Sequence, residues 1–188
     1  MTKKVSVVIL AVMIFSCASF SFAQEEGTLI VAGKYFSLYA SRSVNLSSVL
    51  TKINFNYLLH ADSFESHSDD SSTMLASTLD ALYNEVSDIL DIHVYSFHGS
   101  IRIVSDKGSL SELFKQSFGV DFREPSVYVH EKNTIYISLA DLTLGMLGHE
   151  IAHAIISHFF VVPPPVKIQE VLSGYVEYNL RKTRGSLP

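Results

Sequence analysis

The chain is 188 residues long, with 47% hydrophobic and 18% charged residues and a formal net charge of −5. This composition supports one folded domain with a hydrophobic core and excludes general disorder. No stripe of Lys and Arg is present, so the sequence argues against nucleic acid as a partner.

The first 23 residues have the pattern of a signal peptide. Two lysines follow the start, residues 5–15 are almost entirely apolar, and Ser21-Phe22-Ala23 offers small residues for cleavage. We therefore expect a periplasmic or secreted protein whose mature part, residues 24–188, is a single domain without a membrane span. An uncleaved membrane anchor is the alternative, although the apolar run is short for a bilayer.

The single cysteine, Cys17, lies inside this leader. A lipoprotein site there is conceivable, but Phe15 fits such a site poorly. Cleavage after Ala23 leaves a mature chain with no cysteine. An exported protein without disulfides must be held together by its core, and about 165 residues are enough to build one.

In chain order, the first predicted elements are a β-hairpin and two helices. Residues 28–32 and 35–39 flank Gly33-Lys34, where the glycine supplies the turn. Residues 45–59 carry apolar side chains at helical spacing, and residues 60–72 form a polar loop. Residues 74–90 then form a strongly amphipathic helix that begins at Ser71 or Ser72.

The middle of the chain predicts further strands around one short helix. Residues 93–104 have the pattern of two strands joined at Gly99. Residues 109–118 predict a helix that ends at Gly119. A second hairpin follows, with strands at residues 126–130 and 134–138 around residues 131–133.

Two helices close the chain. Residues 142–160 are apolar all round, which predicts a buried helix with Asp141 or Thr143 as its cap. Three prolines end that helix, and residues 166–181 form the last one. The predicted fold class is α+β, with a small, mostly antiparallel sheet, a helix that carries the active site and a C-terminal helix that supplies a ligand.

The run His149-Glu150-Ile151-Ala152-His153 lies on the buried helix. Residues four apart on a helix are separated by only about 40° around its axis. Both imidazoles can therefore reach one metal ion. Zinc binds imidazole nitrogen readily, so zinc is the expected metal, with iron, cobalt and manganese as alternatives.

Glu150 lies roughly 100° around the helix from His149 and 60° from His153. It can flank the metal without binding it. In that position it can act as a general base that takes a proton from a metal-bound water and passes it to a leaving amine. We therefore predict Glu150 as the catalytic residue.

A catalytic zinc usually has three protein ligands and one open position. The candidates for the third ligand are Glu170 and Glu177, which lie seven residues apart on one face of the last helix. Because they are about 10 Å apart along the axis, only one of them can reach the metal. The residues alone leave this choice open.

Residues 145–178 resemble the gluzincin metallopeptidases, the thermolysin-like branch of the zincins. The resembling pieces are residues 148–154 and 169–175, and the likeness covers about a fifth of the chain. In that family a glutamate on a following helix, commonly in a pattern like E-G-L-A-x-Y, is the third ligand. Here Val171 replaces the glycine and Ser173 the alanine. The resemblance implies Glu170 as the ligand, a minimal zincin-like domain, and peptide or protein substrates.

Other candidate residues are weaker. His158 follows His153 by five residues and points about 140° away from it, so we expect a structural or exposed role. Tyr175 and Tyr178 lie near Glu170, but packing explains them better than stabilisation of an oxyanion. The remaining histidines show no ligand spacing: His60, His67, His93, His98 and His130.

Zincins bind extended peptides along an edge strand above the metal helix. Residues 134–138 just precede that helix and are the best candidate for this strand. The alternative is an ordinary internal strand.

Three functions compete. The first is a zinc peptidase with His149, His153 and Glu170 as ligands and Glu150 as base. The second is a non-catalytic envelope binding protein that keeps zinc as a structural element, as the small size of the chain would allow. The third is a metal-independent envelope protein with a coincidental motif. The oligomeric state is open.

Overall fold

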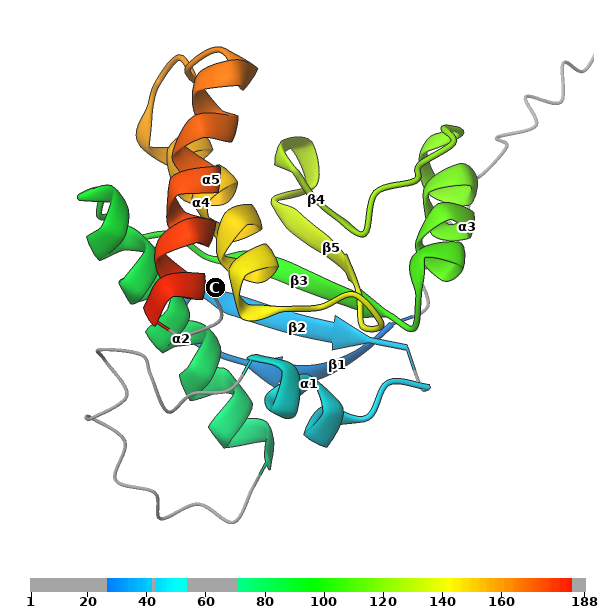
Figure 1. Cartoon of the computed structure of the whole chain (residues 1–188). Coiled ribbons are helices and arrows are strands. Elements are labelled where there is room, and N and C mark those ends of the chain that lie inside the picture. Colours follow the sequence, from blue (N-terminus) through cyan, green and yellow to red (C-terminus); the bar gives the residue numbers. More distant parts are fainter. Residues whose placement is uncertain (1–26, 42, 54–70, 184–188) are drawn as a thin grey trace, which may run out of the picture.

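The computed structural model describes residues 27–41, 43–53 and 71–183. It confirms the α+β class, with a five-stranded sheet and five α-helices in the described residues (Figure 1). The predicted leader and most of the predicted loop at 60–72, with His60 and His67, lie outside the described residues. No helix of the described ranges is long and apolar enough to cross a membrane.

The sheet begins with the predicted hairpin and has the strand order β1-β2-β3-β5-β4. Its strands are β1 (Thr28–Ala32), β2 (Phe36–Ala40), β3 (Gly99–Val104), β4 (Ser126–Val129) and β5 (Thr134–Ser138). The β1–β2 and β4–β5 pairs are antiparallel, as both predicted hairpins require.

The sheet is mixed, and the expectation of a mostly antiparallel sheet is wrong in this respect. The pairs β2–β3 and β3–β5 are both parallel. The chain between β2 and β3 includes two helices. They return the chain to the end of the sheet where β2 begins, so β3 runs in the same direction as β2.

Residues 93–104 form one strand and not the predicted two. Strand β3 starts at Gly99, and its two neighbours are β2 and β5. Because both sides of β3 are taken, residues 93–98 have no free edge of β3 to pair with. They form the connection from the preceding helix, and Phe97 is buried in the core against Tyr83.

The first three helices are α1 (Leu46–Ile53), α2 (Ser71–Leu90) and α3 (Lys107–Phe118). Helix α2 begins at Ser71, one of the two predicted positions. Helix α3 ends as predicted at Gly119, which has a φ of 69° that suits glycine.

The two faces of the sheet are covered by different helices. Alternate side chains of β5 point to opposite faces, so Ile135 and Ile137 join the main core while Tyr136 joins a smaller one with Phe114 of α3. Helix α2 and helix α4 (Leu144–Phe159), which carries His149 and His153, pack on the main-core face.

Helix α4 is buried along most of its length, as its apolar sequence predicts. Of its two candidate caps, Thr143 is the one used, because its hydroxyl accepts a hydrogen bond from the backbone N–H of Met146 at 3.1 Å. Asp141 instead accepts a hydrogen bond from the Ser138 hydroxyl at 2.7 Å.

Helix α5 (Val166–Thr183) follows the proline link and packs closely on α4. The close approach depends on Gly148, because a Cβ atom at that position would overlap Leu180 of α5. Val176 and Leu180 are buried in this contact. The contact fixes the position of α5, and therefore of its glutamates, relative to the histidines of α4.

Candidate metal centre

Three potential ligands meet between α4 and α5. The Nε2 atoms of His149 and His153 lie 3.2 Å apart. Glu170 Oε2 lies 3.5 Å from the first of these nitrogens, and Glu170 Oε1 lies 3.4 Å from the second. Among the described residues, this trio forms a group of donor atoms close enough to hold one metal ion.

The spacing of these atoms fits a tetrahedral metal. Two ligands that each lie about 2.05 Å from a tetrahedral zinc ion are about 3.3 Å from one another. The two Nε2 atoms, 3.2 Å apart, are close to that value, and each nitrogen lies 3.4 or 3.5 Å from a different oxygen of the Glu170 carboxylate. Two imidazole nitrogens and a carboxylate also form a donor set that zinc accepts. The residues therefore fit the metal that the motif implies.

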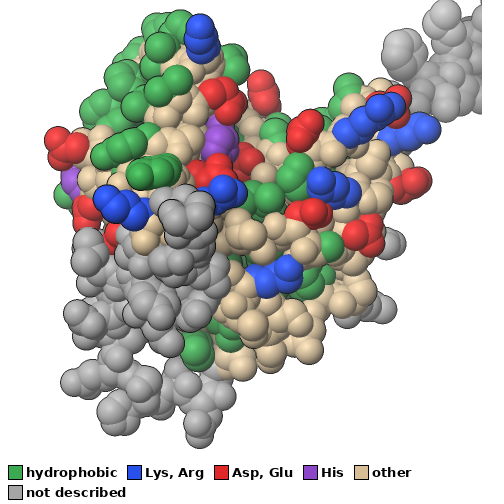
Figure 2. Space-filling model, viewed as in Figure 1, with side chains coloured by type: hydrophobic (Ala, Val, Ile, Leu, Met, Phe, Trp, Pro, Cys, Tyr) green, Lys and Arg blue, Asp and Glu red, His purple; other side chains and the backbone are tan. Residues whose placement is uncertain are grey.

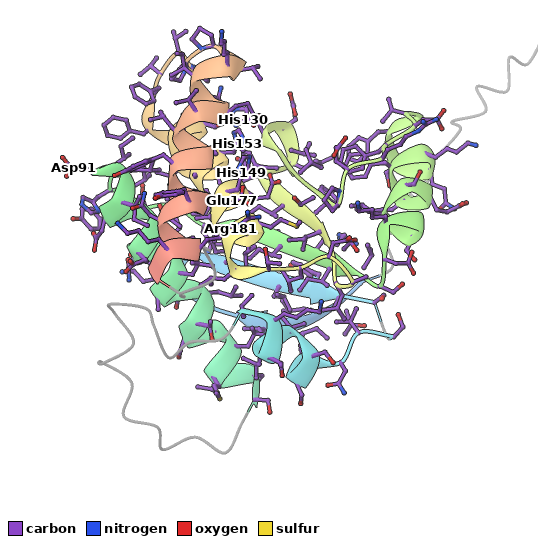
Figure 3. All side chains as sticks on the ribbon, viewed as in Figure 1. Asp91, His130, His149, His153, Glu177 and Arg181 are labelled. Carbon is purple, nitrogen blue, oxygen red and sulfur yellow. The ribbon has the colours of Figure 1, made fainter. Side chains whose placement is uncertain are left out.

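The second ring nitrogen of each histidine faces an acceptor on α5. His149 Nδ1 is buried without a hydrogen bond, and Glu177 Oε2 lies 3.4 Å from it as an ion-pair contact. Glu177 in turn forms an ion pair with Arg181. Figure 3 shows these side chains in a row along the contact between α4 and α5. Glu170 therefore approaches the Nε2 atom of His149, and Glu177 approaches its Nδ1 atom.

His153 is held in a similar way by an amide. Its Nδ1 lies 3.5 Å from Gln169 Oε1, and the Gln169 amide donates to the carbonyl of Pro164 at 2.8 Å. Burial, and next the neighbouring His149, lower the pKa of His153 below its ordinary value. The neutral imidazole that this favours is the form that binds a metal.

Glu150 is buried, at 6% exposure, and turns towards strand β4. Its Oε1 accepts a hydrogen bond from the Ser126 hydroxyl at 2.7 Å, and Tyr128 contributes a backbone hydrogen bond. Burial raises the pKa of Glu150 above its ordinary value, and the hydrogen bond from Ser126 opposes that rise. Strand β4 thus fixes the carboxylate beside the two histidines.

The candidate ligands and Glu150 line one pocket with a volume of about 730 Å³. One wall is strand β4 with Ser126 and Tyr128, and α4 and α5 supply the polar groups. Pro163 of the link between the two helices lies at the pocket as well. Polar groups that converge on one hollow of this size are typical of a binding or catalytic site.

A scan against protein-family models, a search of curated proteins and a search of solved structures found no match for this chain. The site is therefore interpreted from its own geometry. That geometry brings together all four residues that the sequence singles out: His149, Glu150, His153 and Glu170.

Other candidate residues lie apart from the ligand trio. His158 Nδ1 lies 2.9 Å from the carbonyl of Ala154, and its ring packs on Phe97. Tyr175 and Tyr178 are half exposed and do not line the pocket.

The prediction that residues 134–138 form the edge strand that binds the substrate is wrong. Strand β5, residues 134–138, is internal, because it pairs with β3 on one side and β4 on the other. Strand β4 is the edge of the sheet, and Ser126, Val127 and Tyr128 on it line the pocket. The prediction chose the strand that directly precedes the helix in the sequence. In the hairpin, however, the earlier strand, β4, lies at the edge of the sheet.

Sequence reasoning also missed Ser126, Tyr128 and Gln169. Ser126 and Tyr128 carry no local signal, because they meet Glu150 only through the packing of β4 on α4. Gln169 precedes the candidate ligand Glu170, and that position was the one available hint.

Proposed function

We propose that this protein is a zinc-dependent metallohydrolase, and that its substrates are peptides or proteins. The observation that carries the proposal is the arrangement of one ligand atom from each of His149, His153 and Glu170, all within 4.8 Å of one another, beside a buried glutamate in one pocket. His149, His153 and Glu170 would hold the metal. A bound zinc ion would act as a Lewis acid and lower the pKa of a coordinated water towards about 7.

The chain's own residues would transfer the proton and hold the reacting groups in place. Glu150 would accept a proton at its carboxylate and return it to the leaving amine. Ser126 and the backbone of Tyr128 hold that carboxylate in place. Glu177 and Gln169 face the outer nitrogens of the two histidines and so would keep the inner nitrogens directed at a bound metal.

Catalysis is favoured over a purely structural zinc site by the number of ligands. Structural zinc sites usually have four protein ligands, whereas the donor group found among the described residues has three. The group also lies on a pocket wall, where a substrate can enter. A structural site would instead be closed by a fourth side chain.

Peptides are the substrate class that the edge strand supports. Strand β4 pairs with β5 and is last in the strand order, so its outer edge can accept an extended peptide as an added strand. Such a peptide would lie along the pocket next to Glu150. We further propose that the protein acts in the periplasm or outside the cell, after removal of residues 1–23.

The test is zinc content and peptide hydrolysis in the wild type and in Glu150→Gln. Elemental analysis of the protein, purified after metal-replete expression, is expected to give close to one zinc per chain in both. Cleavage of a broad peptide library should be lost in the variant, because an amide cannot accept the proton. A variant that cleaves as fast as the wild type would contradict the mechanism, and a wild type without metal would contradict the site.

A further inference from the structure

The connection from α4 to α5 presents an unusual hydrophobic surface. We name residues 159–166, Phe-Phe-Val-Val-Pro-Pro-Pro-Val, the apolar tip. Val161 and Val162 are 102% and 81% exposed, the highest values for large hydrophobic side chains in the described chain, and Val166 is 71% exposed. Runs of exposed apolar residues are uncommon on soluble proteins unless they have a function.

The hydrophobic surface continues along the outer side of α5. Ile168, Val171, Tyr175 and Tyr178 follow one another at spacings of three and four residues, so they form one stripe, and all four are exposed. Figure 2 shows hydrophobic side chains over this end of the molecule and down the side of the helix pair. Together the tip and the stripe place exposed apolar side chains along one side of the helix pair, which marks a candidate interaction surface.

The charge around the tip differs from that of the whole protein. The chain has a net charge of −5, yet residues 151–169 contain no Asp or Glu. The charged side chain next to the tip is the exposed Lys167. An apolar tip that is bordered by an exposed lysine complements a surface with a hydrophobic interior and anionic groups at its boundary.

We propose that the apolar tip docks on a bilayer that contains anionic phospholipids. Val161 and Val162 enter the boundary between headgroups and acyl chains, and Lys167 lies among the headgroups. The inference is independent of the proposed hydrolase activity, because it rests on different residues. Docking at the tip also brings the pocket close to the bilayer, since Pro163 belongs to both.

The shape of the surface favours a bilayer over a second copy of the chain. The helix pair projects from the rest of the molecule, and its most exposed residues are at its end (Figure 1). A two-fold dimer needs a self-complementary face that buries about 800 Å² per partner. A narrow projecting end inserts into a fluid layer more readily than it packs against an identical projecting end.

The experiment uses tryptophan as a local reporter, because the chain contains no Trp. Val162→Trp places one reporter on the tip. Val120→Trp places a matched reporter on an exposed valine after α3, on the opposite side of the sheet. Each full-length variant is mixed with vesicles of phosphatidylglycerol and phosphatidylethanolamine, some of them with brominated acyl chains. Anything that residues 1–26 contribute to binding is the same in both variants.

We expect the emission of the Val162→Trp variant to shift to shorter wavelength and to be quenched by the brominated chains, while that of Val120→Trp is unchanged. Adding Lys167→Gln should weaken vesicle affinity by about fivefold. Vesicles of phosphatidylcholine alone should also bind more weakly.

Two results would overturn the proposal. One is equal quenching, or none, at the two positions. The other is a blue shift of the Val162→Trp emission without vesicles together with a dimer mass by light scattering, which would assign the patch to a second copy of the chain. As a further check, Val161→Ser with Val162→Ser should abolish binding to the vesicles, measured by co-sedimentation, with unchanged thermal stability because both side chains are exposed.

Discussion

The hydroxyl of Ser126 donates a hydrogen bond of 2.7 Å to Oε1 of Glu150 and so joins the edge strand to the helix that carries the histidines. The two residues are 24 positions apart in the chain. The contact stabilises a buried carboxylate and at the same time fixes its position in the pocket. Its removal should therefore affect both the stability and the function of the protein.

Ser126→Ala is expected to lower the free energy of unfolding by about 1–3 kcal/mol, because it removes a hydrogen bond from a buried acceptor. Urea denaturation would measure this change. In a Glu150→Gln background the loss should be smaller, since a neutral amide needs less stabilisation in a buried position. If the two changes are strictly additive, the negative charge of Glu150 does not strengthen this hydrogen bond.

Glu170 and Glu177 should differ in their effect on zinc binding. Glu170→Ala removes a candidate ligand and should prevent stable zinc binding. Glu177→Ala leaves the ligands intact and removes only the group that faces His149 Nδ1, so we expect a 10- to 100-fold weaker affinity. Competition with a chromogenic chelator would measure both.

Glu112→Ala is a suitable control for that comparison, because Glu112 is an exposed glutamate on α3, which packs on the opposite face of the sheet from α4. It should bind zinc like the wild type. If Glu177→Ala bound as little zinc as Glu170→Ala, the division of roles between the two glutamates would be wrong.

Gly148→Ala should destabilise the protein and weaken zinc binding together. The added methyl group would overlap the end of the Leu180 side chain, which is buried, so we expect helix α5 to shift and to carry Glu170 with it. We expect a loss of about 1–3 kcal/mol in unfolding free energy. Thermal melting and zinc titration would show the two effects.

Leu180→Ala in the Gly148→Ala protein provides the matched test. The smaller side chain makes room for the new methyl group, so zinc affinity should recover even though the truncated core costs some stability. If zinc affinity did not recover, the close approach at Gly148 would not be what sets the position of α5.

Much of the local structure could be predicted from the sequence. The hairpins, the cap of α3 at Gly119 and the long buried helix follow from turn residues and hydrophobic periodicity, which act over a few neighbouring positions. The strand expected before Gly99 failed because pairing partners are set by the whole sheet. Both edges of β3 were already occupied by strands distant in sequence.

The sequence alone determined that the two candidate histidine ligands share one face of a helix. Helical geometry places His149 and His153 on one face at a spacing of four residues, whatever surrounds them. The tertiary structure decided which glutamate meets them. Helix α5 packs on α4 at Gly148, and this sets Glu170 against the Nε2 atoms and Glu177 against the outer nitrogen of His149. It also made β4 the edge strand and brought Ser126 to Glu150, because such contacts depend on the packing of distant elements and not on local spacing.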